Sequence, residues 1–186
     1  MRGRWNARHQ EAAGSPTGVN PWLAEHSELM RGRVPGRALD VACGRGGNAF
    51  FLANLGLQVD AVDLSDVAVA EIRAREVEEK AGVEAQQRDL ESLGLPDGAW
   101  DVIVMTRYLQ RSLFEEMAAA LNPGGAVLVE TFLQGHRGRG GKPFNPDFTL
   151  EPGELKAAFS SLEIVDYREQ VDGRRALAGI VARRIL

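Results

Sequence analysis

From residue 37 onward, short apolar runs alternate with longer segments in which apolar residues recur at the period of a helix. In residues 66–80, for example, Val67, Ala70 and Ala74 fall on one helical face and the charged residues fall on the others. This alternation is typical of βαβ units built around a parallel sheet. We expect strands at residues 38–42, 57–62, 83–87, 100–106, 126–132, 162–167 and 175–182, and helices at residues 48–55, 66–80, 113–121 and 152–159.

The last two expected strands are separated by the short turn Val171-Asp172-Gly173. A turn this short permits only antiparallel pairing, whereas the earlier strands are joined through helices and can run parallel. The sequence therefore predicts an α/β fold with a mostly parallel sheet, one antiparallel strand near its end and helices on both faces. In the helix before the fifth strand, Ser112 and Glu115 have the spacing of a capping box, and Asn122-Pro123-Gly124-Gly125 is expected to end this helix.

Residues 1–36 do not show this alternation and are punctuated by Gly and Pro. We interpret them as an irregular N-terminal arm with one short helix, from Pro21 to Arg31, that has Asn20 as its N-cap. Trp5 and Trp22 need a surface to cover, so the arm is expected either to fold over a bound ligand or to pack on the sheet edge. The 186 residues then divide into this arm and one domain at residues 37–186.

Charge and hydropathy narrow the range of partners. A net charge of −4 and a pI near 5.5 provide no general positive field for a phosphate backbone, so nucleic-acid binding is disfavoured. Apolar runs such as Ala176–Ala182 are far shorter than the ~20 residues of a membrane helix. Residues 1–14 are polar and lack the apolar core of a signal peptide, so we expect a cytoplasmic protein with no membrane partner.

Cys43 is the only cysteine, which excludes an intrachain disulfide and a metal site of several thiolates. His9, His26 and His136 have no ligand-like spacing, so we expect no structural metal. Cys43 itself follows the first strand, where a helix N-terminus can lower the pKa of a thiol. A small residue that fills a tight space beside a ligand is the favoured interpretation over a nucleophile, because no histidine or second thiol is nearby in sequence.

The turn between the first strand and the first helix has the sequence Asp40-Val41-Ala42-Cys43-Gly44-Arg45-Gly46-Gly47, and Asp63 follows the next strand. Glycines here let a ligand approach the backbone, the helix N-terminus offers free N–H groups, and Asp63 can accept from both hydroxyls of a ribose. The pattern indicates a ribose-bearing nucleotide; the alternative is a turn that needs glycine only for its backbone angles. With Ala49 in the third place, the same glycines also match the dinucleotide fingerprint.

Three features favour a cationic nucleotide over a dinucleotide. Asp40 on the first strand suits a ligand with an ammonium and a sulfonium, whereas a pyrophosphate gains nothing from a second negative charge. Asp89, in Arg88-Asp89-Leu90, follows the third strand, where a carboxylate can accept from an adenine amino group. The antiparallel hairpin at the C-terminus is the third feature, because dinucleotide domains normally end in a parallel strand.

These residues resemble the class I S-adenosylmethionine-dependent methyltransferases, over about residues 37–186. The matching pieces, in chain order, are Leu39-Asp40-Val41-Ala42-Cys43-Gly44-Arg45-Gly46, Val59-Asp60-Ala61-Val62-Asp63-Leu64-Ser65, Arg88-Asp89-Leu90, Trp100-Asp101-Val102-Ile103 and Leu121-Asn122-Pro123-Gly124-Gly125. The resemblance implies a Rossmann-like, seven-stranded sheet whose last strand is antiparallel. It also implies S-adenosyl-L-methionine as cofactor and S-adenosyl-L-homocysteine as product.

The same resemblance implies which residues contact the cofactor. The glycine turn packs on its methionine moiety, the acidic residue after the second strand holds its ribose, and the acidic residue after the third strand meets its adenine. The expected cofactor residues are Asp40, Cys43, Gly44, Gly46, Asp63, Leu64, Asp89 and Leu90.

Three further segments resemble small methyltransferases of the tellurite-resistance type: Val129-Glu130-Thr131-Phe132, Asn145-Pro146-Asp147-Phe148 and Pro152-Gly153-Glu154-Leu155. This resemblance implies a small-molecule acceptor, such as a soft nucleophile or a metalloid oxyanion. A noncatalytic nucleotide-binding or regulatory module, an NAD-linked oxidoreductase and an RNA methyltransferase are the alternatives, and the sequence leaves the oligomeric state open.

Methyl transfer from a sulfonium is an in-line displacement, which needs no dedicated base when the acceptor is anionic or soft. Arg107, after the fourth strand, is expected to position the acceptor or to form a surface ion pair. Glu130, near the end of the fifth strand, is expected to orient the substrate or accept a proton, or else to make a structural hydrogen bond. His136, Arg137 and Arg139 lie in the Gly- and Arg-rich stretch 135–146, which is expected to be either an anion-attracting lid or a solvated loop.

Overall fold

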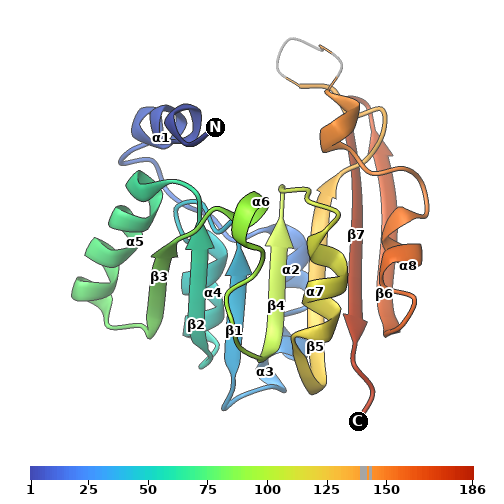
Figure 1. Ribbon diagram of the computed structural model, residues 1–186, viewed down its shortest axis with the longest axis horizontal. Helices are drawn as coiled ribbons and strands as arrows, with labels where there is room; N and C mark the ends of the chain where they lie inside the picture. The colour runs from blue at the N-terminus through green and yellow to red at the C-terminus, as the bar shows by residue number, and fades with distance from the viewer. Residues whose placement is uncertain (139–141, 143) are drawn as a thin grey trace.

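The computed structural model describes residues 1–138, 142 and 144–186 (Figure 1). A seven-stranded sheet has the order β3-β2-β1-β4-β5-β7-β6. The strands are β1 (Arg37–Val41), β2 (Gln58–Asp63), β3 (Val83–Gln87), β4 (Trp100–Thr106), β5 (Leu121–Phe132), β6 (Glu163–Asp172) and β7 (Arg175–Arg183). The helices are α1 (Arg2–Glu11), α2 (Pro21–Glu25), α3 (Ser27–Arg31), α4 (Gly47–Asn54), α5 (Asp66–Glu79), α6 (Leu90–Leu93), α7 (Leu113–Ala119) and α8 (Glu154–Ala158), and a 3-10 turn covers Pro146–Phe148.

Strand pairing confirms the predicted fold class. Strands β1 to β5 pair in parallel, whereas β7 pairs antiparallel with both β5 and β6. Because β1 lies between β2 and β4, the chain reverses its direction of travel across the sheet at this point. In open α/β sheets, such a reversal leaves a crevice at the carboxyl ends of the strands, which is where ligands bind.

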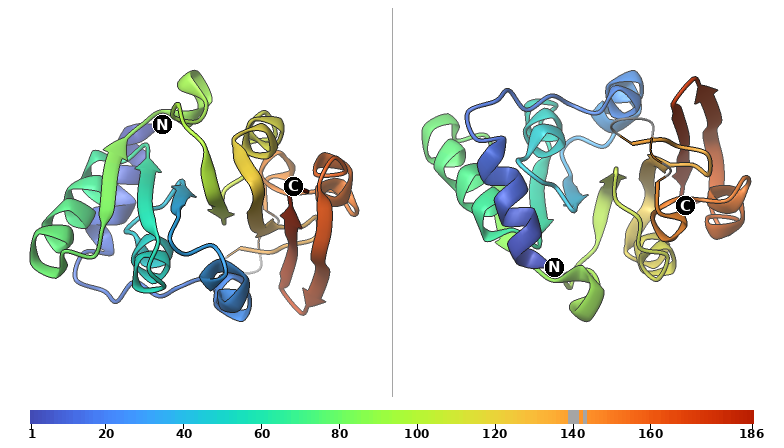
Figure 2. Two further views of the ribbon diagram at one scale, coloured as in Figure 1. Left: turned by 90° about the horizontal axis from the view of Figure 1, so that it is seen from below. Right: turned by 90° about the horizontal axis from the view of Figure 1, so that it is seen from above.

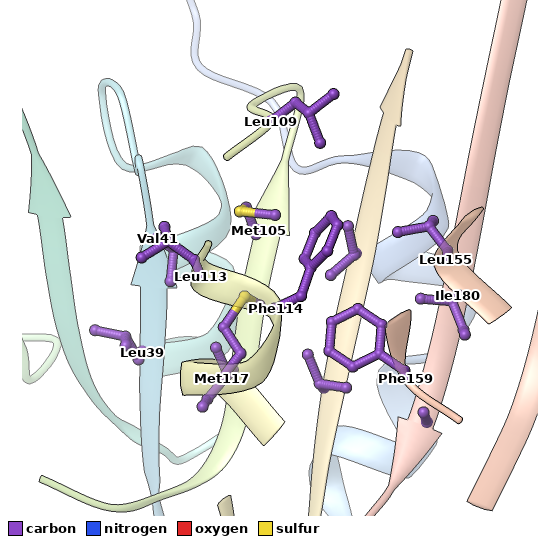
Figure 3. Packing of buried hydrophobic residues seen from close by; sticks show 14 of the residues in the cluster. Leu39, Val41, Met105, Leu109, Leu113, Phe114, Met117, Leu155, Phe159 and Ile180 are labelled. Atoms are coloured by element: carbon purple, nitrogen blue, oxygen red, sulfur yellow. The ribbon is translucent and has the colours of Figure 1, made fainter. Parts of the chain in front are cut away.

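The sheet is covered on both faces (Figure 2). On one face, Phe114 of α7 packs on Phe159, which follows α8, with 5.4 Å between ring centroids. These rings belong to one apolar cluster with Leu155, which lies beside Ile180 of β7 (Figure 3). On the other face, α4 and α5 cover the small side chains of β1 to β3, and Trp22 of α2 packs on Gly179 of β7. Burial on both faces explains why the central strands read as nearly continuous apolar runs.

Two local predictions at α7 are wrong. Ser112 has helical backbone angles of −61° and −22°, and within the described residues its side chain makes no capping hydrogen bond. Strand β5 begins at Leu121, opposite Trp100, so the expected turn at 122–125 forms the first part of the strand. The register shifts between Trp100 and Val102, which accommodates these extra residues.

The N-terminal arm is not irregular, because α1 covers ten of its residues. Asn20 is an N-cap as predicted, and its Oδ1 accepts hydrogen bonds from the N–H groups of Trp22 and Leu23 at 2.9 and 3.3 Å. The expected helix at 21–31 is divided into α2 and α3 at His26. Trp22 is buried on the sheet, where only the missing side chain of Gly179 leaves room for its ring. Within the described residues, no helix has the length and apolar character needed to cross a bilayer.

Candidate functional site

The glycine turn between β1 and α4 has a backbone that favours glycine. Gly44 and Gly46 have φ angles of +53° and +80°, in the left-handed region that side chains rarely adopt. A Cβ at Gly46 would lie 2.9 Å from Cγ1 of Ile72, so the turn also lacks space for a side chain there. Ala42, two residues before Gly44, also has a left-handed φ, of +54°, although it is not a glycine. The turn therefore stores backbone strain directly beside the crevice.

Asp63 joins the end of β2 to this turn. Its Oδ2 accepts a hydrogen bond from the N–H of Gly44, and its Oδ1 accepts one from the N–H of Ser65, each at 2.8 Å. Each carboxylate oxygen has two acceptor positions, so one position on each remains for the hydroxyls of a ligand. These hydrogen bonds fix the orientation of the carboxylate before any ligand arrives.

Asp40 is buried beneath the glycine turn, with 1% of its surface exposed. The N–H of Ala49, in the first turn of α4, donates to this carboxyl group, whereas its Oδ2 has no hydrogen-bond partner among the described residues. Burial, together with the charge of Asp63, raises the pKa of Asp40 to about 8. A buried acid with an unused oxygen is a position where a cationic group of a ligand would be stabilised.

A cavity of about 310 Å³ lies at the carboxyl ends of β2 and β3. The residues that line it are Met1, Arg2, Leu64, Gln87, Asp89 and Glu91. Asp89 is also the N-cap of α6, with Oδ1 accepting from the N–H of Glu91 at 3.1 Å. Its neighbour Leu90 is buried in the core. The structure therefore brings Leu64 and Asp89 to one cavity and buries Leu90 in the core. The other expected cofactor residues, Asp40, Cys43, Gly44, Gly46 and Asp63, are not among the residues that line this cavity.

Sequence reasoning missed the helix that closes this cavity. Seen from above the carboxyl edge, α1 lies across the ends of β2 and β3 with its N-terminus beside α6 (Figure 2). The half-buried residues Trp5, Asn6 and His9 have the spacing of one helical face, and this spacing was the available signal. The spacing did not lead to a predicted helix, because two of these three side chains are polar and helices are predicted from apolar positions.

Cys43 has the properties of a residue that fills space. Its Sγ contacts the carbonyl oxygen of Gly44 at 3.7 Å, and burial raises the pKa of its thiol well above the usual value. A raised pKa is the opposite of what a nucleophilic thiolate requires. Among the described residues, no group of three or more His, Cys, Asp or Glu side chains could hold a metal ion.

On the other side of the crevice, Glu130 is held by two partners. It is buried, and its carboxylate oxygens accept hydrogen bonds from Asn20 Nδ2 at 2.7 Å and from the Arg168 guanidinium at 2.8 Å. Arg107 is exposed, has a φ of +57°, and donates its N–H to the Glu130 carbonyl at 2.8 Å. Arg107 therefore directs a cation toward solvent at the carboxyl edge, whereas Glu130 ties the N-terminal segment to the sheet.

His136 packs against Phe132 and Phe144, with ring centroids 4.3 and 5.3 Å away. Its Nδ1 accepts a hydrogen bond from the N–H of Ala176 at 3.2 Å, so the neutral ring carries its proton on Nε2. Burial lowers the pKa of His136 and keeps the ring neutral at pH 7. Of the two other expected members of a lid, Arg137 is exposed and donates its N–H to the carbonyl oxygen of Arg174 at 2.9 Å, and Arg139 lies outside the described residues.

Comparisons with known proteins identify relatives of the domain that carries this site. A family model described as a methyltransferase domain matches residues 38–125. Hemagglutinin 1 of Eikenella corrodens is 30% identical over 151 residues, which are 77% of this chain and 49% of that protein. A probable S-adenosylmethionine-dependent methyltransferase of Mycobacterium tuberculosis is 31% identical over 121 residues, 60% of this chain and 43% of that protein. The chain thus spans about half the length of the curated relatives that it matches.

Among solved structures, TehB from Haemophilus influenzae superposes with a TM-score of 0.77. The match covers 97% of this chain and 67% of the TehB chain, with 20% sequence identity. At this identity the likeness establishes the fold, and the site has to be argued from its own residues.

Proposed function

The chain contains a methyltransferase domain of the class I S-adenosylmethionine-dependent type, and we propose that it transfers the methyl group of S-adenosylmethionine to a small-molecule acceptor. We place this domain at residues 37–186 and treat residues 1–36 as a segment that completes its site. A cytoplasmic location stays a prediction.

The buried carboxyl group of Asp40 carries this proposal. Asp40 is 1% exposed, and its Oδ2 lacks a hydrogen-bond partner in the described part of the chain. Burying such an oxygen costs free energy of folding unless a ligand provides the missing partner. S-adenosylmethionine has the required charge, because it carries an ammonium and a sulfonium. NAD instead presents a pyrophosphate to the glycine turn, where the carboxyl group of Asp40 would meet it unfavourably.

The other residues of the site fit the remaining parts of this cofactor. Asp63 would accept from the ribose hydroxyls, and Asp89 would lie at the adenine end of the cavity. Gly44, with its left-handed backbone, leaves no side chain between a ligand and the turn, whereas a side chain at Gly46 would collide with the buried Ile72 and Phe50. Cys43 would fill the space beneath the methionine moiety.

When bound, the cofactor supplies a methyl group on a sulfonium, and the lone pair of the acceptor bonds to the methyl carbon as the C–S bond breaks. The work of the protein is then alignment and exclusion of water. Glu130 is occupied by Asn20 and Arg168, and the proton of neutral His136 sits on Nε2. Neither group is arranged as a free base.

We therefore propose an acceptor whose lone pair can attack without prior removal of a proton by the protein, such as a soft nucleophile or a metalloid oxyanion. Arg107 would attract an anionic acceptor to the carboxyl edge, and Nε2–H of His136 would donate a hydrogen bond to it. The resemblance of three segments to tellurite-resistance-type methyltransferases supports the same acceptor class.

Calorimetric titration with S-adenosylmethionine, S-adenosylhomocysteine and NAD tests the proposal. We expect micromolar binding of the first two, no binding of NAD, and a large loss of affinity in Asp63→Ala. An Asp97→Ala variant, which changes an acidic side chain outside the site, is the matched control. Binding of NAD alone would overturn the proposal in favour of an NAD-linked oxidoreductase, and binding of S-adenosylmethionine without turnover on any acceptor would favour a regulatory module.

A further inference from the structure

Helix α1 covers the proposed cofactor site without an apolar face of its own. Its ten residues are Arg-Gly-Arg-Trp-Asn-Ala-Arg-His-Gln-Glu, all of them described, and none is buried. Isolated helices of this length are marginal in water, and most helices in proteins are stabilised by packing an apolar face. The stability of α1 must therefore come from its few contacts with the rest of the molecule.

The contacts in the middle of α1 are polar and point to the start of α5. Asn6 donates from Nδ2 to Oδ1 of Asp66 at 2.5 Å, and its Oδ1 accepts from the hydroxyl of Ser65 at 2.7 Å. Ser65 is also the residue whose N–H binds Asp63. One side chain of α1 is thus connected, through Ser65, to the carboxylate assigned to the ribose.

The C-terminal end of α1 contacts the glycine turn. Arg45, within this turn, donates to the carbonyl oxygen of Ala12 at 2.6 Å and also pairs with Glu71 of α5. His9 lies on Gly44, since a Cβ built there would be 3.6 Å from Cε1 of the ring. Net hydrogen bonds are individually weak, so these contacts hold the helix in place without fixing it permanently.

The N-terminal end of α1 forms one wall of the 310 Å³ cavity. Met1, the N-cap of α1, and Arg2 line this cavity together with Leu64, Gln87, Asp89 and Glu91 from the ends of β2 and β3 and the start of α6. A ligand that fills the cavity would therefore touch α1 and the sheet edge at once. Such a ligand binds the docked helix more tightly than the undocked helix and so shifts the population toward docking.

We propose that α1 is the outer wall of the cofactor site, that Arg2 and His9 are cofactor-contacting residues, and that α1 docks stably only when the cofactor is bound. This inference rests on the proposed function, because it takes the ligand of the cavity to be S-adenosylmethionine or its product. Exchange of product for fresh cofactor would then require α1 to undock.

A proline in the middle of α1 separates the helix from its contacts. Ala7 is exposed and lies inside α1, so Ala7→Pro breaks the helix without removing a docking side chain, and Ala7→Ser is the matched control. In calorimetric titration of the full chain with S-adenosylhomocysteine, we expect the Kd to rise about tenfold in Ala7→Pro and to stay unchanged in Ala7→Ser. A tenfold rise corresponds to a tenfold smaller population of the binding-competent state with α1 docked.

Hydrogen exchange of the wild-type chain provides a second test that needs no variant. Amides of residues 5–11 should exchange rapidly in the free protein and at least tenfold more slowly with saturating S-adenosylhomocysteine. Trp5 gives an independent optical signal, because Trp22 and Trp100 are buried at 2% and 1% exposure. Ligand should change the fluorescence of the wild-type chain, and Trp5→Phe should abolish that change.

The outcomes separate the two proposals. Tight binding of S-adenosylhomocysteine with equal affinity in Ala7→Pro, or with unchanged exchange in α1, would overturn the role of α1 and leave the proposed function standing. Absence of binding in the wild-type chain would overturn both. Protection of α1 together with the loss of affinity in Ala7→Pro alone would establish the helix as part of the site.

Discussion

Replacing Asp40 with asparagine removes a titration that we expect to control cofactor affinity. With a pKa of about 8, the Asp40 carboxyl is mostly protonated in the free protein at pH 7. An ammonium bound beside it stabilises the ionised form, so binding should release a proton from this group. The Kd of wild-type protein for S-adenosylhomocysteine should therefore fall about tenfold for each pH unit between pH 6 and 8 and level off above pH 8.

The asparagine variant isolates this effect, because it keeps the shape of the side chain and cannot ionise. Titrations in buffers of different ionisation enthalpy count the protons released; we expect nearly one more proton at pH 7 for wild type than for Asp40→Asn. Taking the difference also cancels the titration of the amino group of the ligand. Identical pH profiles in the two proteins would refute the assignment of Asp40 to the cationic end of the cofactor.

The same group predicts how stability varies with pH. A pKa raised from 3.8 to about 8 means that the folded state binds the proton more tightly than the unfolded state. Its contribution to stability is fully present below pH 3.8 and is lost as the pH rises toward 8. The free energy of unfolding of wild type, relative to Asp40→Asn, should fall by about 1.4 kcal/mol per pH unit in this range. Urea denaturation at pH 5 and pH 7 measures it, and a constant difference would contradict the reasoning.

The remaining predictions concern the glycine turn and the opposite wall. Ala42→Gly should raise the free energy of unfolding by about 1 kcal/mol, because it relieves a non-glycine residue at a φ of +54°, and an unchanged urea midpoint would count against stored strain. Glu130→Gln should cost about 1–3 kcal/mol, since it leaves the partly exposed Arg168 without its buried partner; lost turnover at full stability would instead make Glu130 a base. Cys43 should react with iodoacetamide far more slowly than a free cysteine at pH 8 in the folded chain, and rapid labelling would contradict its raised pKa.

The sheet was predictable because its information is local. Strands β3 and β4 coincide with the predicted residues, and a short turn before β7 required the antiparallel pairing that is observed. The turn lies at residues 173–174 and not at 171–173, because Val171 and Asp172 pair with β7 as the end of β6. The glycine turn was equally visible, because residues close in sequence form it. Within such segments, apolar period, turn chemistry and strand length all point to the same structure.

The opposite wall of the crevice was not predictable in this way. Glu130 contacts Asn20 across 110 positions and Arg168 across 38, and neither partner has a local sequence signal that names the other. The orphaned Oδ2 of Asp40, in the described structure, likewise depends on the turn folding over it. Sequence patterns identify which acidic, basic or polar residues stand at the ends of strands. Which distant side chain each of them pairs with depends on how the helices and strands pack.

Helix α1 is a case in which the failure of prediction is itself informative. Amphipathic period predicts helices that are stabilised by an apolar core, and α1 escapes such prediction because it has no buried residue among its ten described positions. A helix without a buried face has little to lose by undocking, which is what a wall that opens for cofactor exchange requires. The polar inner face that hid α1 in the sequence is therefore also the physical reason to expect that it docks and undocks with the cofactor.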